Sequence, residues 1–202
     1  SKLQVIGKSA FYYSSIQKIS IPPHVKQICA KAFQYCENLK EVEILPNSDL
    51  KIIGKCAFFN TSIKAISIPP HVTKICDMAF LHSQLKKIEI PENSELQEIE
   101  GCQFWYSPIE EIYIPENLLD INNELLNSNI KIIEINPKNP RYSNYQNKFI
   151  IGKSKLEKKN YDILVFCDKN AEKVTIPSFI EIIGPYSFNF CLNIQSIEFS
   201  EN

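Results

Sequence analysis

The sequence predicts a solenoid, a fold in which short units of similar sequence stack on one another into one elongated domain. Three observations predict it. A bend with small residues and an anchoring phenylalanine recurs along the chain, an isoleucine-rich strand pattern follows the bend, and the anchors return every 22 to 25 residues. A unit of this length cannot bury its own apolar face, so each copy needs neighbours like itself.

The clearest unit spans residues 53–69. It begins with a bend that contains Gly54 and the anchoring Phe58, and it continues into a strand at residues 66–68. In this strand two isoleucines alternate with a serine, so both isoleucines are expected on one face of a sheet. Pro69 has no amide hydrogen to donate to a neighbouring strand, and we expect the strand to end there.

The unit recurs through nearly the whole chain. Copies of the bend begin at Ile6, Ile28, Ile75, Ile99 and Ile183. Copies of the strand lie at residues 19–21, 42–44, 88–90, 112–114, 133–135, 174–176 and 197–199. The anchors of the first five units are Phe11, Phe33, Phe58, Phe80 and Phe104. A repeat of this length around an L-x-x-I-x-I core is typical of leucine-rich-repeat solenoids.

The repeat weakens and then stops in the second half of the chain. Over residues 118–130, Leu125 or Leu126 takes the place of the phenylalanine and Asn122 that of the glycine. Residues 136–173 contain no bend. They are predicted to form a loop (136–147), a strand (148–151), a charged turn (152–160) and a second strand (161–167). Two apolar runs around a polar turn predict a β-hairpin at the edge of the solenoid.

The chain as a whole is predicted to be one solenoid domain, residues 1–202, with an irregular island at 136–173. Neither end has the polar capping segment that solenoids need, which favours a segment of a longer protein. The chain has 22 basic and 23 acidic residues and a net charge of −1. This balance argues against nucleic acid as a partner, and no apolar window is long enough to span a membrane.

The titratable residues indicate a protein without catalysis, cofactor or metal. His24 and His71 lie in equivalent turns two units apart, about 10 Å from each other, which is too far to share a zinc ion. We therefore predict exposed turn histidines and a non-enzyme, since no phosphate loop, zinc spacing or nucleophile motif is present. The seven cysteines are predicted to be unpaired, because cysteines in the same phase of the repeat are two or more units apart. A pairing across phases, such as Cys56 with Cys76, stays open.

The predicted binding residues lie on the strands. Residues that flank the first isoleucine of each strand point away from the core, and solenoids bind extended partners on this concave surface. The candidates are Glu89, Glu111, Tyr113 and Glu134. Like charges on adjacent strands are unfavourable, so a basic partner would compensate them. The alternative is an aromatic edge that follows the anchors: Tyr12, Tyr13, Tyr35, Phe59, Trp105, Tyr106 and Phe190.

The pattern I-G-x-x-A-F-x-x-(C/S)-x-x-(L/I)-x-x-I-x-I-P resembles the BspA-like leucine-rich repeats of mucosal bacteria and protozoan parasites. Residues 139–142, N-P-R-Y, also resemble a recurrent N-P-x-Y loop of that family. The resemblance implies an α/β fold: a right-handed solenoid with a parallel β-sheet on the concave face and short helical turns on the convex face. Gln103 in place of alanine and Pro108 depart from the pattern, and local differences are expected there.

The resemblance also implies a function. Members of the family are typically surface or secreted proteins that bind host matrix or other cells. We therefore expect a cell-surface adhesin or receptor-type module whose partner is an extracellular matrix or host surface protein. The alternative is an intracellular, cytoplasmic scaffold that binds a regulatory protein, and reduced cysteines favour it.

Overall fold

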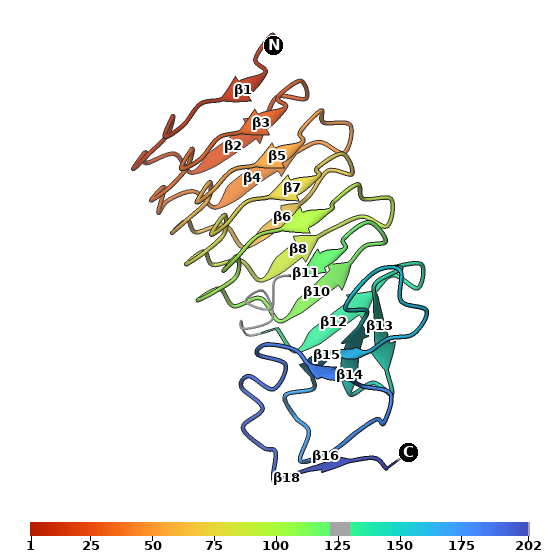
Figure 1. Cartoon of the computed structure of the whole chain (residues 1–202). Helices are drawn as coiled ribbons and strands as arrows, with labels where there is room; N and C mark the ends of the chain where they lie inside the picture. The colour runs from red at the N-terminus through yellow and green to blue at the C-terminus, as the bar shows by residue number, and fades with distance from the viewer. Residues whose placement is uncertain (122–129, 202) are drawn as a thin grey trace.

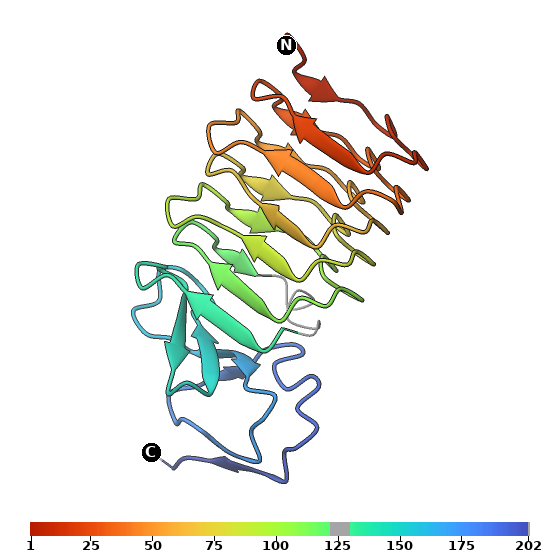
Figure 2. The same cartoon turned by 180° about the vertical axis from the view of Figure 1, so that it is seen from behind.

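The computed structural model describes residues 1–121 and 130–201. They form a stack of chain turns, here called rungs, with the two termini at opposite ends (Figure 1). Each regular rung contributes two short strands, and these lie in two rows that run along the stack (Figure 2). This arrangement is the solenoid that the sequence predicts.

The first row consists of the predicted isoleucine-rich strands and forms the concave face. Its strands pair in parallel, in register, so that Ile19 lies beside Val42 and Ile66 beside Ile88. They are β2 (Lys18–Ile21), β4 (Glu41–Ile44), β6 (Ala65–Ser67), β8 (Lys87–Glu89), β10 (Glu111–Ile114), β12 (Ile132–Ile135), β16 (Lys173–Ile176) and β18 (Ser196–Phe199).

The second row was not predicted as strands. It is a parallel six-stranded sheet of two-residue strands, each of which ends in a buried isoleucine. The isoleucine that begins each of the first five bend motifs is therefore the inward residue of this sheet, whereas Ile183 lies in another sheet and is exposed. The strands are β1 (Val5–Ile6), β3 (Gln27–Ile28), β5 (Ile52–Ile53), β7 (Lys74–Ile75), β9 (Glu98–Ile99) and β11 (Asp120–Ile121).

The expected helical turns on the convex side do not occur in the described parts of the chain, which contain no helix. The bends instead return to positive φ at two places, three and seven residues after the short strand, as at Lys31 (φ 61) and Tyr35 (φ 60). A helix needs consecutive residues near φ −60°. The backbone of the bend also bonds to the next rung rather than to itself: the Phe33 amide donates to the Ala57 carbonyl at 2.8 Å.

The anchoring phenylalanines form a stacked ladder in the core. The ring centroids are 5.0 Å apart between Phe11 and Phe33, 5.2 Å between Phe33 and Phe58, and 5.6 Å between Phe58 and Phe80. Phe104 continues the ladder at 6.2 Å from Phe80. The last four rings are fully buried, as the repeat register predicts for Phe58 and Phe80.

The side chain of Gln103, the predicted departure from alanine, makes hydrogen bonds to three backbone groups. It is fully buried. Its Oε1 accepts a hydrogen bond from the Ala79 amide at 2.8 Å, and its Nε2 donates to the Cys76 carbonyl at 2.6 Å and to the Glu100 carbonyl. A buried amide is stable only when such partners are present, so the rung keeps its path without the small residue.

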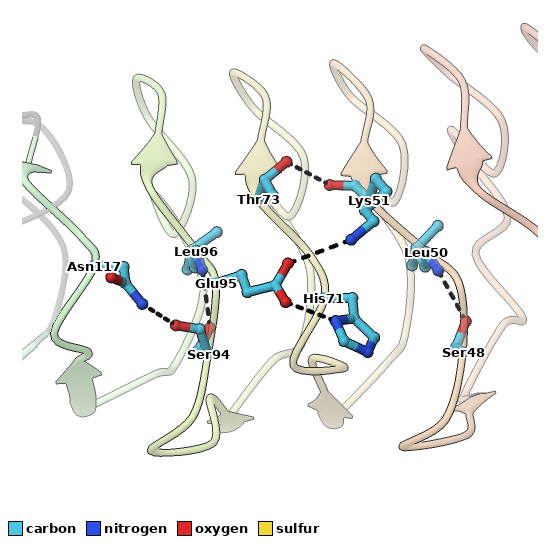
Figure 3. Close-up of polar contacts among 9 residues, drawn as sticks. All are labelled: Ser48, Leu50, Lys51, His71, Thr73, Ser94, Glu95, Leu96 and Asn117. Carbon is cyan, nitrogen blue, oxygen red and sulfur yellow. Dashed lines mark hydrogen bonds and ion pairs between the residues drawn. The ribbon is translucent and has the colours of Figure 1, made fainter.

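The turns after the concave strands are tied to one another across rungs (Figure 3). Glu95 accepts from His71 at 2.8 Å and from Lys51 at 3.3 Å. The buried hydroxyl of Ser94 accepts from the Leu96 amide at 3.2 Å and so closes its own turn. His24 contacts Asp49 at 3.1 Å in the same way. Both histidines are exposed, as predicted, and their carboxylate partners were not predicted.

The island contains the predicted hairpin and one further strand. β14 (Phe149–Gly152) and β15 (Ile163–Cys167) pair antiparallel. The segment predicted as a loop contains β13 (Tyr142–Tyr145), which pairs antiparallel with β14; its polar sequence gave no strand signal. β15 pairs in parallel with β17 (Ile182–Ile183), so the hairpin joins the strands that follow it. The replacements expected at Asn122 and at Leu125 or Leu126 lie outside the described residues.

Candidate binding surface

The four predicted binding residues lie on the concave face, on three strands that follow one another in the stack (Figure 1). Glu89 is on β8, Glu111 and Tyr113 are on β10, and Glu134 is on β12. The three carboxylates are exposed and Tyr113 is half-buried. Their neighbours Ile88, Ile112 and Ile133 are buried, so the expected alternation of the strands positions these side chains.

The strand register brings only part of this set together. Tyr113 lies directly opposite Glu134, whereas Glu111 lies opposite Ile132. The Tyr113 hydroxyl accepts a hydrogen bond from Asn136 Nδ2 at 2.8 Å, which holds the ring in place. Tyr113 and Glu134 therefore form one contiguous surface, and Glu111 belongs to the neighbouring row.

Glu89 is compensated within its own sheet. Its carboxylate accepts from Lys87 Nζ at 2.6 Å and from Ser67 Oγ at 2.5 Å. These hydrogen bonds, that from Lys87 first, hold the pKa of Glu89 below its ordinary value. The sequence argument treated Glu89 as part of an uncompensated column of charge, but Lys87 lies beside it on the same strand.

An open hollow of about 790 Å³ lies beside Tyr113 and Glu134. Its wall carries the carboxylates of Glu92, Glu116 and Glu134, and Lys138 is the one cationic residue. The remaining lining residues are Asn93, Tyr113, Ile135, Asn136, Pro137 and Asn144. We call this region the acidic hollow. The island contributes to its lining, because Asn144 belongs to β13.

Glu92 and Glu116 were not among the sequence candidates, although the sequence contains a signal for them. The tetrapeptide I-P-E-N occurs at residues 90–93 and again at 114–117, one repeat later. Equivalent positions in consecutive units stack in a solenoid, so the two glutamates had to lie on adjacent rungs. Sequence reasoning considered the strands and did not extend to the turns that follow them.

The members of the aromatic edge in residues 12–106 are connected by ring contacts, whereas Phe190 lies beyond the island. Tyr12, Tyr13, Tyr106 and Phe190 are exposed, and Tyr35, Phe59 and Trp105 are half-buried.

Across residues 1–121 and 130–201 no group of three histidine, cysteine or acidic side chains is placed to hold a metal ion. No helix in those same ranges is long and apolar enough to cross a bilayer.

The repeat geometry agrees with a comparison against known families. A family described as BspA type leucine rich repeat region matches six copies in residues 4–133 and 159–202. The chain belongs to this family. The resemblance of the bend and strand pattern is thereby confirmed over most of the chain, and the gap between the matched ranges, residues 134–158, begins at the end of β12 and continues into the island.

Several solved structures are similar to this chain in fold. The pneumococcal vaccine antigen PcpA has a TM-score of 0.81 at 22% identity over 98% of this chain. A leucine-rich repeat protein from Eubacterium ventriosum has a TM-score of 0.77 at 21% identity over 98%. A leucine rich cell surface protein from Faecalibacterium prausnitzii has 0.64 at 21% over 97%.

Because each identity is below 25%, these similarities show the fold alone. The chain covers 51%, 54% and 58% of the lengths of the three solved proteins, respectively. A comparison with the curated proteins gives no significant match.

Proposed function

We propose that this BspA-type solenoid is a protein-binding module of a cell-surface or secreted protein, and that its acidic hollow receives a basic segment of an extracellular matrix or host surface protein. The observation that carries the proposal is the acidic hollow itself, an open depression of about 790 Å³ whose lining includes Tyr113 and Glu134 side by side.

The chemistry of the hollow fits a partner with lysine or arginine side chains. Three carboxylates around one depression attract a cationic segment and orient it. Tyr113 adds a ring that is already held by Asn136, so little side-chain entropy is lost when a partner packs against it. Aromatic residues of this kind are frequent anchors of protein interfaces.

The surface location is supported by the family and by two of the similar structures. One of these is described as a vaccine antigen and another as a cell surface protein. Leucine-rich-repeat solenoids use their surfaces for binding, and the non-enzymatic function that we propose agrees with that use. The adhesin function follows from the same family relationship.

The proposal is tested by capture of matrix proteins on the immobilised chain. The double reversal Glu116→Lys with Glu134→Lys should abolish capture of any protein bound by the unmodified chain. The reversal Glu43→Lys is the matched control, because Glu43 is also exposed on a concave strand but lies at the other end of the face. Circular dichroism should be the same for all variants.

The salt dependence of capture provides a second criterion. If the hollow binds a basic segment, capture by the unmodified chain should weaken as ionic strength rises, since exposed charge pairs are screened within about 10 Å at 0.1 M salt. Equal capture by the double reversal and by Glu43→Lys would contradict the proposal.

A further inference from the structure

A second surface of the molecule has no role in the proposed function. It runs along the bends, at the sixth and seventh residues after the isoleucine that ends each short strand. We call it the aromatic ridge. Its members are Tyr12, Tyr13, Tyr35, Phe59, His82, Trp105 and Tyr106. Tyr12 is 44% exposed, Tyr13 63% and Tyr106 71%, so the ridge presents ring surface to solvent at both of its ends.

Five of these rings form an unbroken row over five rungs. Tyr13 stacks on Tyr35 with a centroid distance of 4.6 Å, and His82 stacks on Tyr106 at 4.4 Å. Phe59 joins the two stacks, 5.3 Å from Tyr35 and 5.6 Å from His82. The row is therefore a single aromatic surface rather than separate contacts.

Three rings of the ridge, exposed Tyr12 and half-buried Phe59 and Trp105, are inclined steeply to a neighbouring ring. A stacked ring has one face covered by its neighbour. Phe59, in contrast, is inclined by 75° to Tyr35, and Trp105 by 82° to Tyr106. Tyr12 is inclined by 81° to Tyr13 and by 83° to Tyr35, with centroid distances of 4.7 and 5.8 Å. At these distances its inner face lies against the edges of that stack, and its other face is turned away from it.

The three turned rings lie on alternate rungs. Adjacent parallel strands are about 4.8 Å apart, so rings two rungs apart are spaced by about 10 Å. Tyr12, Phe59 and Trp105 therefore recur at about the same interval along the stack. A ligand that repeats its own structure at the same interval along a straight line could contact all three.

The backbone gives no reason for aromatic residues in this row. Tyr13, Tyr35, His82 and Tyr106 all have positive φ, between 57 and 60. Glycine and asparagine tolerate this conformation best, and Asn60 occupies the equivalent place on the third rung. Bulky side chains held in an unfavourable backbone conformation concentrate at functional sites.

Polar groups lie beside the rings. Gln34 occupies the place between Tyr12 and Phe59 on the second rung; it is 7% exposed, and its Oε1 has no hydrogen-bond partner. Asn60 Nδ2 donates to the Glu37 carboxylate at 3.0 Å, and Ser62 Oγ donates to the Glu37 carbonyl at 2.5 Å. A buried acceptor without a donor is unfavourable, and a hydroxyl-rich ligand supplies donors.

We propose that the aromatic ridge binds an extended β-1,4-linked polysaccharide. The apolar faces of alternate sugar rings pack on Tyr12, Phe59 and Trp105, because such a chain is straight and presents the same face at every second sugar. The sugar hydroxyls donate to Glu37 and, after a small rotation of the amide, to Gln34. This glycan site is distinct from the acidic hollow.

The test uses soluble oligosaccharides as probes. Trp105 is the only tryptophan of the chain, so its fluorescence reports directly on the ridge. Chitohexaose or cellohexaose should shift and change the intensity of this fluorescence and should release heat in calorimetry. Maltohexaose, which is α-1,4-linked and curved, should bind about tenfold more weakly. A preference between the two β-1,4 probes would show whether the acetamido group is recognised.

Substitutions locate the site. Tyr12→Ala should weaken chitohexaose or cellohexaose binding by about tenfold, the loss of one aromatic contact, whereas Tyr12→Phe should bind as the unmodified chain does. Tyr186→Ala is the control, since Tyr186 is an exposed tyrosine (56%, against 44% for Tyr12) that lies off the ridge. Trp105→Phe, followed by calorimetry, should bind more weakly than the unmodified chain.

Three results would overturn the glycan site. One is no response to either β-1,4 hexasaccharide up to about 5 mM, and another is equal binding of maltohexaose. The third is unchanged binding by Tyr12→Ala and Trp105→Phe when their melting temperatures match that of the unmodified chain. The double reversal Glu116→Lys with Glu134→Lys should leave glycan binding unchanged, so failure here is distinguishable from failure of the proposed function.

Discussion

The core of each rung depends on single aromatic residues whose positions repeat. Phe58 lies between Phe33 and Phe80 with ring planes within 4° of parallel to both. The narrow interior has no second layer that could move into the space of a lost ring. The sequence predicts this residue well, since the anchor recurs at nearly constant spacing and only an inward position explains a phenylalanine in every bend.

Phe58→Ala should lower the free energy of unfolding by about 3–5 kcal/mol, because it removes buried apolar surface and leaves a cavity. Denaturant unfolding measures this loss of unfolding free energy. Phe199→Ala is the control: Phe199 is 67% exposed, and its loss should change stability by no more than about 0.5 kcal/mol. A change well below 1 kcal/mol at Phe58 would mean that the repeat register is wrong.

The cysteines differ in reactivity because they differ in burial. All seven are free thiols. Burial, with smaller contributions from nearby Cys191 and Asp168, raises the pKa of Cys167 to about 12. The thiolate is the reactive form, so Cys167 in the folded chain should be alkylated far more slowly than half-buried Cys29. Mass measurement after alkylation of the unfolded chain without reductant should show seven adducts, and five would indicate a disulfide.

At the level of elements, the island depends on one buried carboxylate that precedes β15. The Asp162 side chain is 3% exposed. It accepts from Lys158 Nζ at 2.5 Å and from the amide and hydroxyl of Ser154 at 2.7 and 2.5 Å. Lys158 also contacts Glu181 at 2.8 Å. The charged turn is thereby tied to the rung that follows the island.

The stability of the island should depend on pH through Asp162. Burial alone would raise its pKa, but the hydrogen bonds from Lys158 and Ser154 outweigh burial and lower it. A lowered carboxyl pKa stabilises the fold above the unfolded value of about 3.9, and this contribution is lost as pH falls through the folded value. Asp162→Ala should therefore cost up to about 3 kcal/mol at pH 7.

The same comparison at low pH supplies the control. Below the folded pKa of Asp162 its carboxyl group is neutral in the unmodified chain. The difference in unfolding free energy between the unmodified chain and Asp162→Ala should therefore become small. Denaturant titrations at a series of pH values from 7 downward follow this difference. A difference that does not shrink at the lower pH would show that packing, and not the charge, explains the effect.

At the scale of the whole molecule, each rung contacts its neighbours, and stability is therefore distributed along the stack. One buried cluster extends from Ile6 to Phe166, and a smaller one, around Leu164 and Val174, lies at the C-terminal end. The last strands leave Ile183 46% and Phe199 67% exposed. Local opening follows from few buried contacts.

Hydrogen exchange should reveal this gradient in the chain of 202 residues. Amides of β16 and β18 should exchange faster than those of β4 and β5 at the same pH and temperature, because the smaller cluster stabilises them. Hydrogen exchange followed on individual peptides by mass spectrometry measures these rates. Uniform protection from β1 to β18 would mean that the rungs unfold as a single cooperative unit.

The sequence by itself determined the rung. Periodic isoleucines and phenylalanines can be buried only if equivalent positions stack, so the length of the unit, the concave strands, the inward anchors and the hairpin of the island all follow from spacing. It also identified Tyr113 and Glu134 as neighbours on the open face, since alternation along a strand leaves them no other side.

Only the tertiary structure decided what depends on contacts between rungs. The bends became strands and positive-φ turns instead of helical turns, because their amides bond to the next rung. Glu89 accepts a hydrogen bond from Ser67 on the adjacent strand, and Glu92 and Glu116 line the acidic hollow together with residues of β10, β12 and the island. The turned rings of the aromatic ridge likewise depend on packing between bends, and repeat spacing carries no information about the angle of a ring.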